Sequence, residues 1–574
     1  MRSLRALRIL RTGSKIPHHA YQIPKSRGAI RNGYCSVCEP SNDPLLAPST
    51  PQTTKSSKKP VETLPPDHRQ LGIDQELFTS SIYSPGSTIF LPNGTKIFNA
   101  LTDFLRLQYD HFGFQEVITP TIYKKSLWEK SGHWENYAED MYSVTGRGAE
   151  GEKEGRQIGE DEEYGLKPMN CPGHCLIFAS KLRSYRDLPI RYADFSPLHR
   201  NEISGALSGL TRVRRFHQDD GHIFCRPSQI REEISKTLEF VRLAYEVLCL
   251  GPYRLALSTR PKDHFIGTIE EWDNAEQALK DSLDSSGLAW TVNEGDGAFY
   301  GPKIDIILKD SDGKEHQTAT IQLDFQLPKR FGLEYQAPAP ELERKGLTTD
   351  DPELLGTQGP VTPVLIHRAV LGSVERIMAL LIERFNGKWP FWLNPRQVLI
   401  VTINDSESVV QHAQGVIESI QSYVRPGGAL DVGGIASASS GLARGHRLSV
   451  DIDTSARPLK KKLGMAKAKG YGVIIVVGEK NVASNFLNVD FSGIPNYRYD
   501  IRHDKLLSKM EKWMKKFESD EANKAKLGDI QKETDVADDA KEENQPISLQ
   551  KIRNFTISSG DLKKVLHAFK TAYL

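Results

Sequence analysis

The sequence predicts an α+β protein, in which a large and mostly antiparallel sheet domain precedes a small α/β domain. Three observations predict it. Strand-like segments dominate residues 190–325 and are interrupted by helical segments at 227–250 and 268–285. The pattern changes at residues 394–395, and beyond them β-branched runs alternate with helical segments over roughly 120 residues.

Composition excludes several classes of protein. The chain has 574 residues, of which 38% are hydrophobic and 26% charged, as in ordinary globular proteins. No apolar run reaches the roughly 18 residues that a membrane span needs, so we expect no membrane partner. The net charge of +2 means that any nucleic acid must be held by local basic patches. Six cysteines in so long a chain indicate thiols or metal ligands and no disulfide framework.

The first 38 residues contain no Asp or Glu, and arginines alternate with leucines along residues 2–11. This pattern predicts a mitochondrial transit peptide over residues 1–38 and therefore a location in the mitochondrial matrix. A disordered basic tail is the alternative. Residues 39–66 are rich in Pro, Ser, Thr and Lys, which predicts a disordered linker.

The larger domain is expected at 67–393. Apolar residues at helical spacing predict a helix over 96–112, which Gly113 ends. A strand is expected at 115–120, and the acidic, Gly-rich residues 146–163 predict a surface insertion. Residues 304–309 and 315–325 are expected to pair as strands across the turn at 310–313.

The smaller domain is expected at 394–502. It starts with a strand at 398–403 and a helix to about residue 423, and residues 426–446 form a Gly/Ala/Ser-rich insertion. A basic helix at 460–469 and a buried strand at 472–477 follow. Residues 503–574 alternate in charge, which predicts a charged and partly helical C-terminal tail.

Three stretches carry candidate chemistry. In residues 196–225, Arg200 and Glu202 precede a Gly/Ser-rich turn, and three more arginines follow, whose planar forks suit phosphate. A basic surface hairpin is the alternative, but it does not explain the cluster of Gln218, Asp219, Asp220 and His222. In residues 167–175, KPMNCPGHC is by itself a weak metal signal. In residues 362–376, His367 taken by itself is more often a buried, hydrogen-bonded histidine than a metal ligand.

Together these stretches resemble the threonyl-tRNA synthetase family. Residues 168–174 are similar to its zinc-cysteine loop, 199–225 to class II motif 2, and 363–376 to motif 3. The resemblance covers about residues 67–500, and further segments that carry it are DHRQLG at 67–72, TPTIYKKSLWEKSGHWENY at 119–137, EGDGAFYGPKID at 294–305 and TIQLDFQLPKRF at 320–331.

The resemblance implies a class II antiparallel-sheet catalytic domain followed by an α/β anticodon-binding domain. It implies a threonine–tRNA ligase that uses ATP with Mg²⁺, L-threonine and tRNA(Thr), and a homodimer whose motif 1 proline is Pro120. Arg200 and Arg376 would be catalytic. The positions implied for ATP are Arg200, Glu202, Arg212, Phe216, Gln317 and Arg376, and those for threonine are Met169, Gln218, Asp220, Tyr300 and Gln322.

The family's zinc ligands match Cys171, His222 and His367. An apolar pocket separates threonine from valine by only about 10²-fold, so we expect the zinc to recognise the threonine hydroxyl and not to activate water. Serine also has a hydroxyl. Because only about 66 residues precede the catalytic domain, we expect the short mitochondrial form of the family, without an N-terminal editing domain.

Several positions depart from the family pattern. Ser208 stands where a histidine is common, Arg215 and His217 replace glycine and threonine, and Ala319 replaces a glycine. Asp453 and Ser455 stand where arginine and glutamate usually read the anticodon, so the anticodon read is open. The lysines at 460–462 are interpreted either as phosphate contacts or as a solvated helix face.

Two rival functions remain. A prolyl- or seryl-tRNA synthetase would not need the three metal ligands together. A non-catalytic paralogue that binds RNA or a partner protein would be expected to lose an ATP-contacting arginine or a ligand, and none is lost here.

Overall fold

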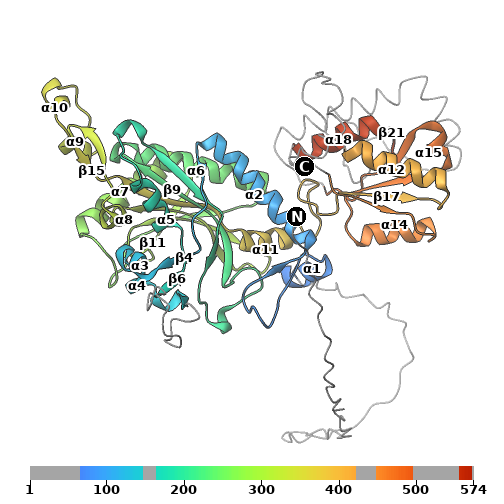
Figure 1. The fold of residues 1–574 in the computed structure, drawn as a ribbon, viewed down its shortest axis with the longest axis horizontal. Helices are drawn as coiled ribbons and strands as arrows, with labels where there is room; N and C mark the ends of the chain where they lie inside the picture. The colour runs from blue at the N-terminus through green and yellow to red at the C-terminus, as the bar shows by residue number, and fades with distance from the viewer. Residues whose placement is uncertain (1–64, 146–162, 422–447, 496–554, 572–574) are drawn as a thin grey trace, which may run out of the picture. The chain divides into compact units, whose positions relative to one another are not determined.

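The computed structural model describes residues 65–145, 163–421, 448–495 and 555–571. The predicted transit peptide, the two predicted insertions, and most of the linker and of the C-terminal tail lie outside the described residues. All the described residues belong to the second of two compact units, Leu64–Leu574. Two sheets, each with its own helices and its own apolar core, form the two domains of this unit (Figure 1).

A nine-stranded sheet forms the centre of the first domain. Its strand order is β11-β10-β12-β13-β16-β9-β7-β3, and β8 pairs with β9. All neighbours are antiparallel except the pairs β10–β11 and β3–β7. The strands are β3 (Gln115–Glu116), β7 (Ile190–Asp194), β8 (Pro197–His199), β9 (Arg215–Cys225), β10 (Arg254–Ser258), β11 (Trp290–Asn293), β12 (Lys303–Lys309), β13 (Glu315–Asp324) and β16 (Val364–Ser373).

Long amphipathic helices bury their apolar faces against this sheet. In α6, the residues Ile234, Leu238, Val241 and Tyr245 recur every three or four positions and are all buried. Thr268 and Glu271 cap α7 reciprocally, which fixes where that helix begins. The helices around the sheet are α1 (His68–Asp74), α2 (Pro92–Phe112), α6 (Ile230–Val247), α7 (Ile269–Ser286) and α11 (Val374–Arg384).

Short elements complete the first domain. One small sheet consists of β4 (Ile122–Lys124), β5 (Ser143–Val144) and β6 (Tyr164–Leu166). Another pairs β14 (Tyr335–Pro338) with β15 (Gln358–Val361). β1 (Phe78–Thr79) pairs with β2 (Ile89–Phe90). The short helices are α3 (Lys125–Ser131), α4 (His133–Asn136), α5 (Cys171–Ala179), α8 (Gln326–Phe331), α9 (Pro340–Arg344) and α10 (Pro352–Gly356).

The second domain contains a five-stranded sheet in the order β18-β17-β19-β20-β21. The first three strands of this order are parallel, and β20 and β21 run antiparallel to their neighbours. Its elements are β17 (Val398–Thr402), α12 (Glu407–Gln421), β18 (Val450–Asp453), α14 (Leu459–Ala468), β19 (Val473–Val477), α15 (Glu479–Ser484), β20 (Phe486–Asp490), β21 (Phe555–Ser558) and α18 (Ser559–Thr571).

Two findings change what the sequence predicts for this domain. The end of the expected tail, residues 555–571, supplies an edge strand and a helix to the domain, whereas the predicted boundary at 502 leaves it outside. Lys462 is buried, and its ammonium donates to the carbonyls of Thr402, at 2.9 Å, and Asp453, at 3.4 Å. The prediction that Lys462 contacts phosphate is therefore wrong, while Lys460 and Lys461 remain exposed.

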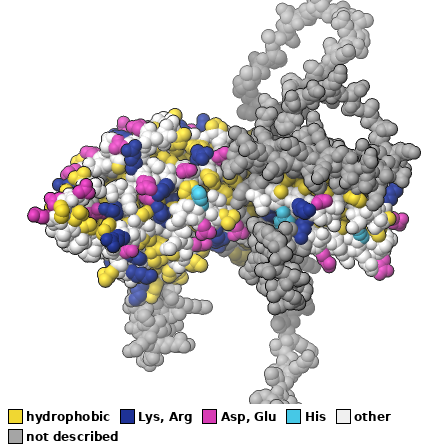
Figure 2. All heavy atoms as spheres, turned by 90° about the horizontal axis from the view of Figure 1, so that it is seen from above, with side chains coloured by type: hydrophobic (Ala, Val, Ile, Leu, Met, Phe, Trp, Pro, Cys, Tyr) yellow, Lys and Arg dark blue, Asp and Glu magenta, His cyan; other side chains and the backbone are white. Residues whose placement is uncertain are grey.

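The surface carries both signs of charge. Figure 2 shows basic and acidic side chains interspersed over one face of the described residues, with apolar side chains between them. This pattern agrees with the small net charge of the chain. Within the described residues, no helix is both long enough and apolar enough to cross a membrane.

Candidate active site

One cavity of about 470 Å³ gathers the residues that the sequence predicts for ATP, threonine and metal. It opens on the face of the large sheet formed by β9, β13 and β16. The predicted residues that line it are Met169, Cys171, Arg200, Glu202, Arg212, Phe216, Gln218, Asp220, His222, Tyr300, Gln317, Gln322, His367 and Arg376. Pro120 lies outside the cavity and is exposed.

Strand register brings two of the predicted metal ligands together. His222 on β9 and His367 on β16 are directly opposite each other in an antiparallel pair, so their side chains share a face. Nε2 of His222 lies 3.0 Å from Nδ1 of His367. Cys171 begins α5, and its sulfur and the two ring nitrogens lie within 4.8 Å of one another. All three residues are buried.

Neighbouring side chains orient these ligands. Nε2–H of His367 donates to the buried Asp324 at 2.8 Å, which leaves Nδ1 with a free lone pair facing His222. Nδ1 of His222 lies 2.8 Å from Nδ1 of His174, which leaves Nε2 facing His367. Sequence reasoning did not assign these two supporting residues. The available signal was that Asp324 follows Gln322 by two positions on β13, the spacing that places two side chains on one face.

The chemistry of this set fits zinc. Burial raises the pKa of the Cys171 thiol well above its usual value and lowers the pKa of His222 well below its own. His222 is therefore neutral, as a histidine that binds a metal must be, and a cation would compensate a buried thiolate. A Cys/His/His set with a fourth coordination position left open is typical of catalytic zinc sites.

Polar groups suited to an amino acid lie next to the three ligands. Asp220 accepts hydrogen bonds from the Asn170 backbone amide at 3.3 Å and from its side chain at 3.1 Å. Burial raises the pKa of Asp220. The Tyr300 hydroxyl donates to Gln322 Oε1 at 2.5 Å. This end of the cavity therefore offers a buried carboxylate and oriented polar groups beside a metal-binding set.

The other end of the cavity is strongly basic. Burial, together with the nearby Arg200 and Arg212, lowers the pKa of Arg376. The Arg200 guanidinium lies 5.0 Å from the centroid of the Phe216 ring, and Nε of Arg200 is buried without a hydrogen-bond partner in the described part of the chain. Arg212 donates to Glu202 at 2.8 Å. Converging guanidinium groups of this kind suit a polyphosphate.

Sequence reasoning missed several further lining residues, among them one aromatic and one basic side chain. Tyr137 and Lys303 also face the cavity. Lys303 makes ion pairs with Asp305, at 3.1 Å, and Asp296, at 3.3 Å. Tyr137 and Lys303 both lie in stretches that carry the family resemblance, and this resemblance is the signal that could have identified them.

Comparisons with known proteins agree with this geometry. Residues 155–345 match the family described as the tRNA synthetase class II core domain (G, H, P, S and T). The mitochondrial threonine–tRNA ligase of Saccharomyces cerevisiae is 47% identical over 72% of this chain and 84% of its own length. A protein of Schizosaccharomyces pombe described as a probable mitochondrial threonine–tRNA ligase is 48% identical over 77% of this chain and 87% of its own length.

The chain belongs to the threonine–tRNA ligase family. Its function as an ATP-dependent threonine–tRNA ligase and its class II fold, both predicted from the sequence, are thereby confirmed. The chain covers only 52% of the length of a probable cytoplasmic relative in Dictyostelium discoideum.

Solved structures place the fold in the same family. The crystal structure titled as the RNA binding domain of threonyl-tRNA synthetase from Cryptosporidium parvum has a TM-score of 0.62 and 43% identity, over 74% of this chain and 92% of its own. A putative threonyl-tRNA synthetase from Aeropyrum pernix has a TM-score of 0.56 and 28% identity, over 75% of this chain and 90% of its own.

Proposed function

We propose that this threonine–tRNA ligase selects its amino acid through a zinc ion held by Cys171, His222 and His367. The observation that carries the proposal is that these three residues and Asp220 line one cavity. When bound, the zinc would supply an open coordination position for the amino and hydroxyl groups of a substrate. Asp220 accepts the hydroxyl proton, and valine, which has no hydroxyl, leaves that buried carboxylate unpaired.

The arginine end of the cavity holds ATP. Arg200 donates to the α-phosphate and Arg376 to the γ-phosphate, while Glu202 accepts from the adenine amino group and Phe216 stacks on the ring. Gln317 lies beside the nucleotide. Mg²⁺, bound with ATP, would share the charge on the phosphates, as in other phosphoryl-transfer sites. The unpaired Nε of Arg200 supports a ligand in this place.

In the first step, a carboxylate oxygen of threonine forms a bond to the α-phosphorus and pyrophosphate leaves. In the second, a hydroxyl at the tRNA 3′ end attacks the carbonyl carbon, AMP leaves with the bonding electron pair, and the departing phosphate oxygen takes up the hydroxyl proton. The chain supplies positioning and charge stabilisation for both steps, so no covalent nucleophile is required. Gln218, Tyr300, Gln322 and Met169 hold the amino acid against the metal-binding set.

We assign the enzyme to the mitochondrial matrix and expect a homodimer. The acid-free residues 1–38 and the mitochondrial names of two relatives support the location. Fusion of residues 1–38 to a fluorescent protein should direct it to mitochondria, and diffuse cytosolic fluorescence would refute the assignment. The residues around Pro120, next to the edge strand β3, support the dimer.

The zinc proposal is tested with amino-acid-dependent ATP–pyrophosphate exchange, together with metal analysis of protein that lacks residues 1–38. We expect about one zinc per chain, strong exchange with threonine, weaker exchange with serine and none with valine or proline. Cys171→Ala should lose both the zinc and the exchange, while Cys249→Ala, outside the cavity, should keep them. Full exchange with threonine in zinc-free protein would refute the proposal.

A further inference from the structure

The loop that leads into β9 is held through the backbone of two consecutive residues, Leu210 and Thr211. Its tip is a tight turn in which the amides of Thr211 and Arg212 both donate to the Ser208 carbonyl. The next amide back, that of Leu210, donates to Nε2 of His68 at 3.2 Å. The Thr211 carbonyl accepts from Nε of Arg376 at 3.2 Å. The tip is therefore fixed from outside the loop by two side chains that are distant in sequence.

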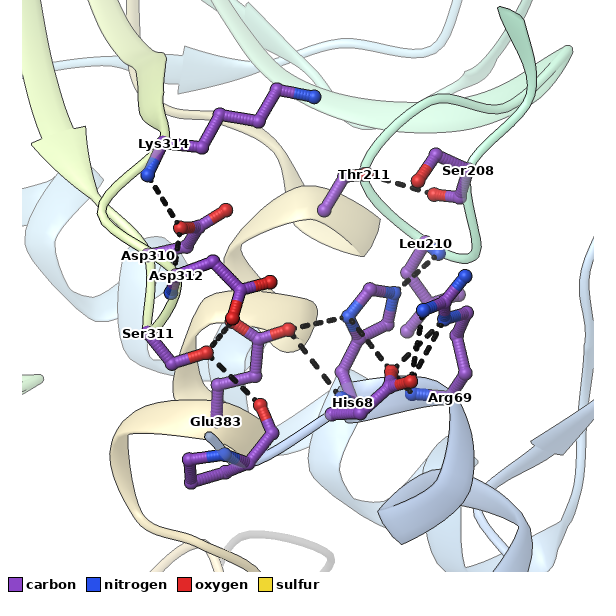
Figure 3. A network of polar contacts seen from close by, with 12 residues as sticks. His68, Arg69, Ser208, Leu210, Thr211, Asp310, Ser311, Asp312, Lys314 and Glu383 are labelled. Carbon is purple, nitrogen blue, oxygen red and sulfur yellow. Dashed lines mark hydrogen bonds and ion pairs between the residues drawn. The ribbon is translucent and has the colours of Figure 1, made fainter. Parts of the chain in front are cut away.

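His68 reaches the loop from the start of α1. The Asp67 side chain caps this helix by accepting from the Arg69 amide, which sets the direction of His68. Because Nε2 accepts from Leu210, the ring proton lies on Nδ1, which donates to Glu383 Oε1 at 2.6 Å. Figure 3 shows this chain of contacts, with Ser311 donating to the other oxygen of Glu383 at 3.2 Å.

Both anchors of the loop depend on α11, because Arg376 is part of this helix and His68 is hydrogen-bonded to Glu383 on it. Glu383 follows Arg376 by about two turns, a separation that returns to the same face of a helix. Arg376 holds the Thr211 carbonyl directly, and Glu383 holds the Leu210 amide through His68. The helix that carries the expected γ-phosphate arginine thus also fixes the tip of the loop.

The ring of His68 and the loop fit closely. A Cβ added at Gly209 would lie 2.2 Å from His68 Nε2, and the φ of Gly209 is +47°. A side chain at this position would therefore push the loop away from the ring. Leu210 itself is buried in the core of the first domain. Contact on both sides leaves the tip little freedom to move while His68 is in place.

We infer that His68 is a positioning residue that fixes this loop for ATP. Arg212 directly follows the anchored Thr211, and its ion pair with Glu202 at 2.8 Å spans the loop. Both side chains line the nucleotide end of the cavity. A loop released from His68 would carry them away from ATP without disturbing the threonine end. This inference rests on the proposed binding of ATP in that part of the cavity.

Asp67, His68 and Glu383 also bring three potential ligand atoms together. A metal ion would need a free lone pair on the ring of His68. Nε2 already accepts from Leu210, and Nδ1 carries the proton that Glu383 accepts. The contacts of this cluster are therefore those of a hydrogen-bonded anchor.

Two variants separate the contacts of His68. In His68→Asn, the amide reaches about as far as Nδ1 and can still donate to Glu383, but nothing accepts from Leu210. In His68→Gln, the amide oxygen reaches about as far as Nε2 and can accept from Leu210. His111→Asn, at an exposed position on α2, is the matched control. The measurements are pyrophosphate exchange with ATP or threonine varied, and amide hydrogen exchange of the loop.

We expect the KM for ATP to rise about tenfold in His68→Asn, with the KM for threonine unchanged, because an unpaired amide costs about that factor. Hydrogen exchange at Leu210 should accelerate by a similar factor, and His68→Gln should restore most of both. An unchanged KM for ATP together with unchanged loop exchange would overturn the inference, as would equal changes in both KM values.

Failure of this inference can be distinguished from failure of the proposed function. If the unmodified enzyme shows no pyrophosphate exchange with threonine, the proposed substrate assignment fails, and loop hydrogen exchange still decides whether His68 holds the loop. If His68→Asn does not fold, the comparison of His68→Gln with the unmodified enzyme decides. If the Leu210 amide exchanged ten times faster in His68→Gln, this would contradict the role given to Nε2 of His68 as its hydrogen-bond acceptor.

Discussion

Asp220 is the buried carboxylate at the threonine end of the cavity, and its raised pKa shows how poorly this environment solvates it. A ligand hydroxyl would give it a hydrogen-bond donor. In Asp220→Asn the amide keeps the shape and loses the charge. We expect kcat/KM for threonine in pyrophosphate exchange to fall about 10⁴-fold, because sites built to pair a hydroxyl discriminate by about 10⁴- to 10⁵-fold.

Serine activation should fall together with threonine activation, since both depend on a hydroxyl. The zinc content should stay at about one ion per chain, because Asp220 is not one of the three ligands. Unchanged kcat/KM for threonine would remove Asp220 from substrate recognition. Loss of zinc from the variant would instead place it among the metal-holding groups.

Asp324 would act on the proposed zinc through His367, from which it accepts a hydrogen bond of 2.8 Å. Its carboxylate also accepts the Gln326 and Leu327 amides at the start of α8, so Asp324→Asn, with one oxygen, cannot serve both roles. We expect zinc affinity, measured by chelator competition, to fall about 10- to 100-fold. Asp312→Asn, on an exposed turn, should leave it unchanged. Equal affinities in the two variants would contradict a supporting role for Asp324.

At the residue scale, the sequence predicts those positions whose chemistry is carried by recognisable stretches. Cys171, His222 and His367 are far apart in sequence, and only the resemblance assigns them to one site. Spacing could not assign them, because the pairing of His222 with His367 depends on strand register. The anchoring role of His68 was equally hidden, because its ring joins α1, a loop and α11 through two hydrogen bonds.

Among the elements, α9 is tied to the rest of the first domain by a buried ion pair. Glu343 on α9 accepts two hydrogen bonds from Arg226, both of 2.6 Å, and one from the Tyr335 hydroxyl at 2.7 Å. Burial alone would raise the pKa of Glu343, but these donors outweigh burial and lower it. The stabilisation is therefore present above the ordinary glutamate pKa of 4.5 and is lost as pH falls through the lowered value.

Glu343→Gln should lower the free energy of unfolding of the first domain by about 3 kcal/mol at pH 7, as breaking a buried pair does. Denaturant titrations at pH 7 and below pH 4 measure this, and the difference from the unmodified chain should shrink at the lower pH. Glu341→Gln is the matched control, since Glu341 lies on the same helix with its side chain 82% exposed. A difference that does not depend on pH would contradict the ionic origin.

The C-terminal helix α18 belongs to the core of the second domain. Leu562, Leu566 and Phe569 are fully buried, and the Phe569 ring lies 5.7 Å from that of Phe391. Phe569→Ala should destabilise this domain by about 3 kcal/mol, measured by chemical denaturation, because it opens a cavity in a packed core. Lys564→Ala, at an exposed position of the same helix, should cost little. Equal stability of the two variants would show that α18 is dispensable.

Element boundaries mark the limit of sequence reasoning in this domain. The strand at 472–477 is visible in the sequence as an uninterrupted apolar run and the helix at 460–469 as a lysine-rich segment, and they correspond to β19 and α14. The pairing of β21 with β20 is not visible, because a long charged stretch separates the two strands. Lys462 shows the same limit, since composition alone cannot tell a solvated lysine from one that donates to buried carbonyls.

At the scale of the whole molecule, none of the described strands pairs with the outer side of β3, at one edge of the large sheet. β3 is the last strand of its order, and Ile118, two residues beyond it, has 88% of its surface exposed. Pro120 follows, and Ile122 is also exposed. An exposed edge strand with apolar side chains beside it is prone to pair with another chain. A second copy of this chain is the expected occupant of this edge.

This expectation is tested by the mass of the purified enzyme in solution. Light scattering after gel filtration at micromolar concentration should give twice the chain mass, and Ile118→Asp should shift it to the monomer, because a buried carboxylate in an apolar interface has no partner. Val292→Asp changes an exposed apolar residue on β11, the strand at the opposite end of the order, and should remain dimeric. A monomeric unmodified enzyme, or a dimeric Ile118→Asp variant, would place the subunit contact elsewhere or remove it.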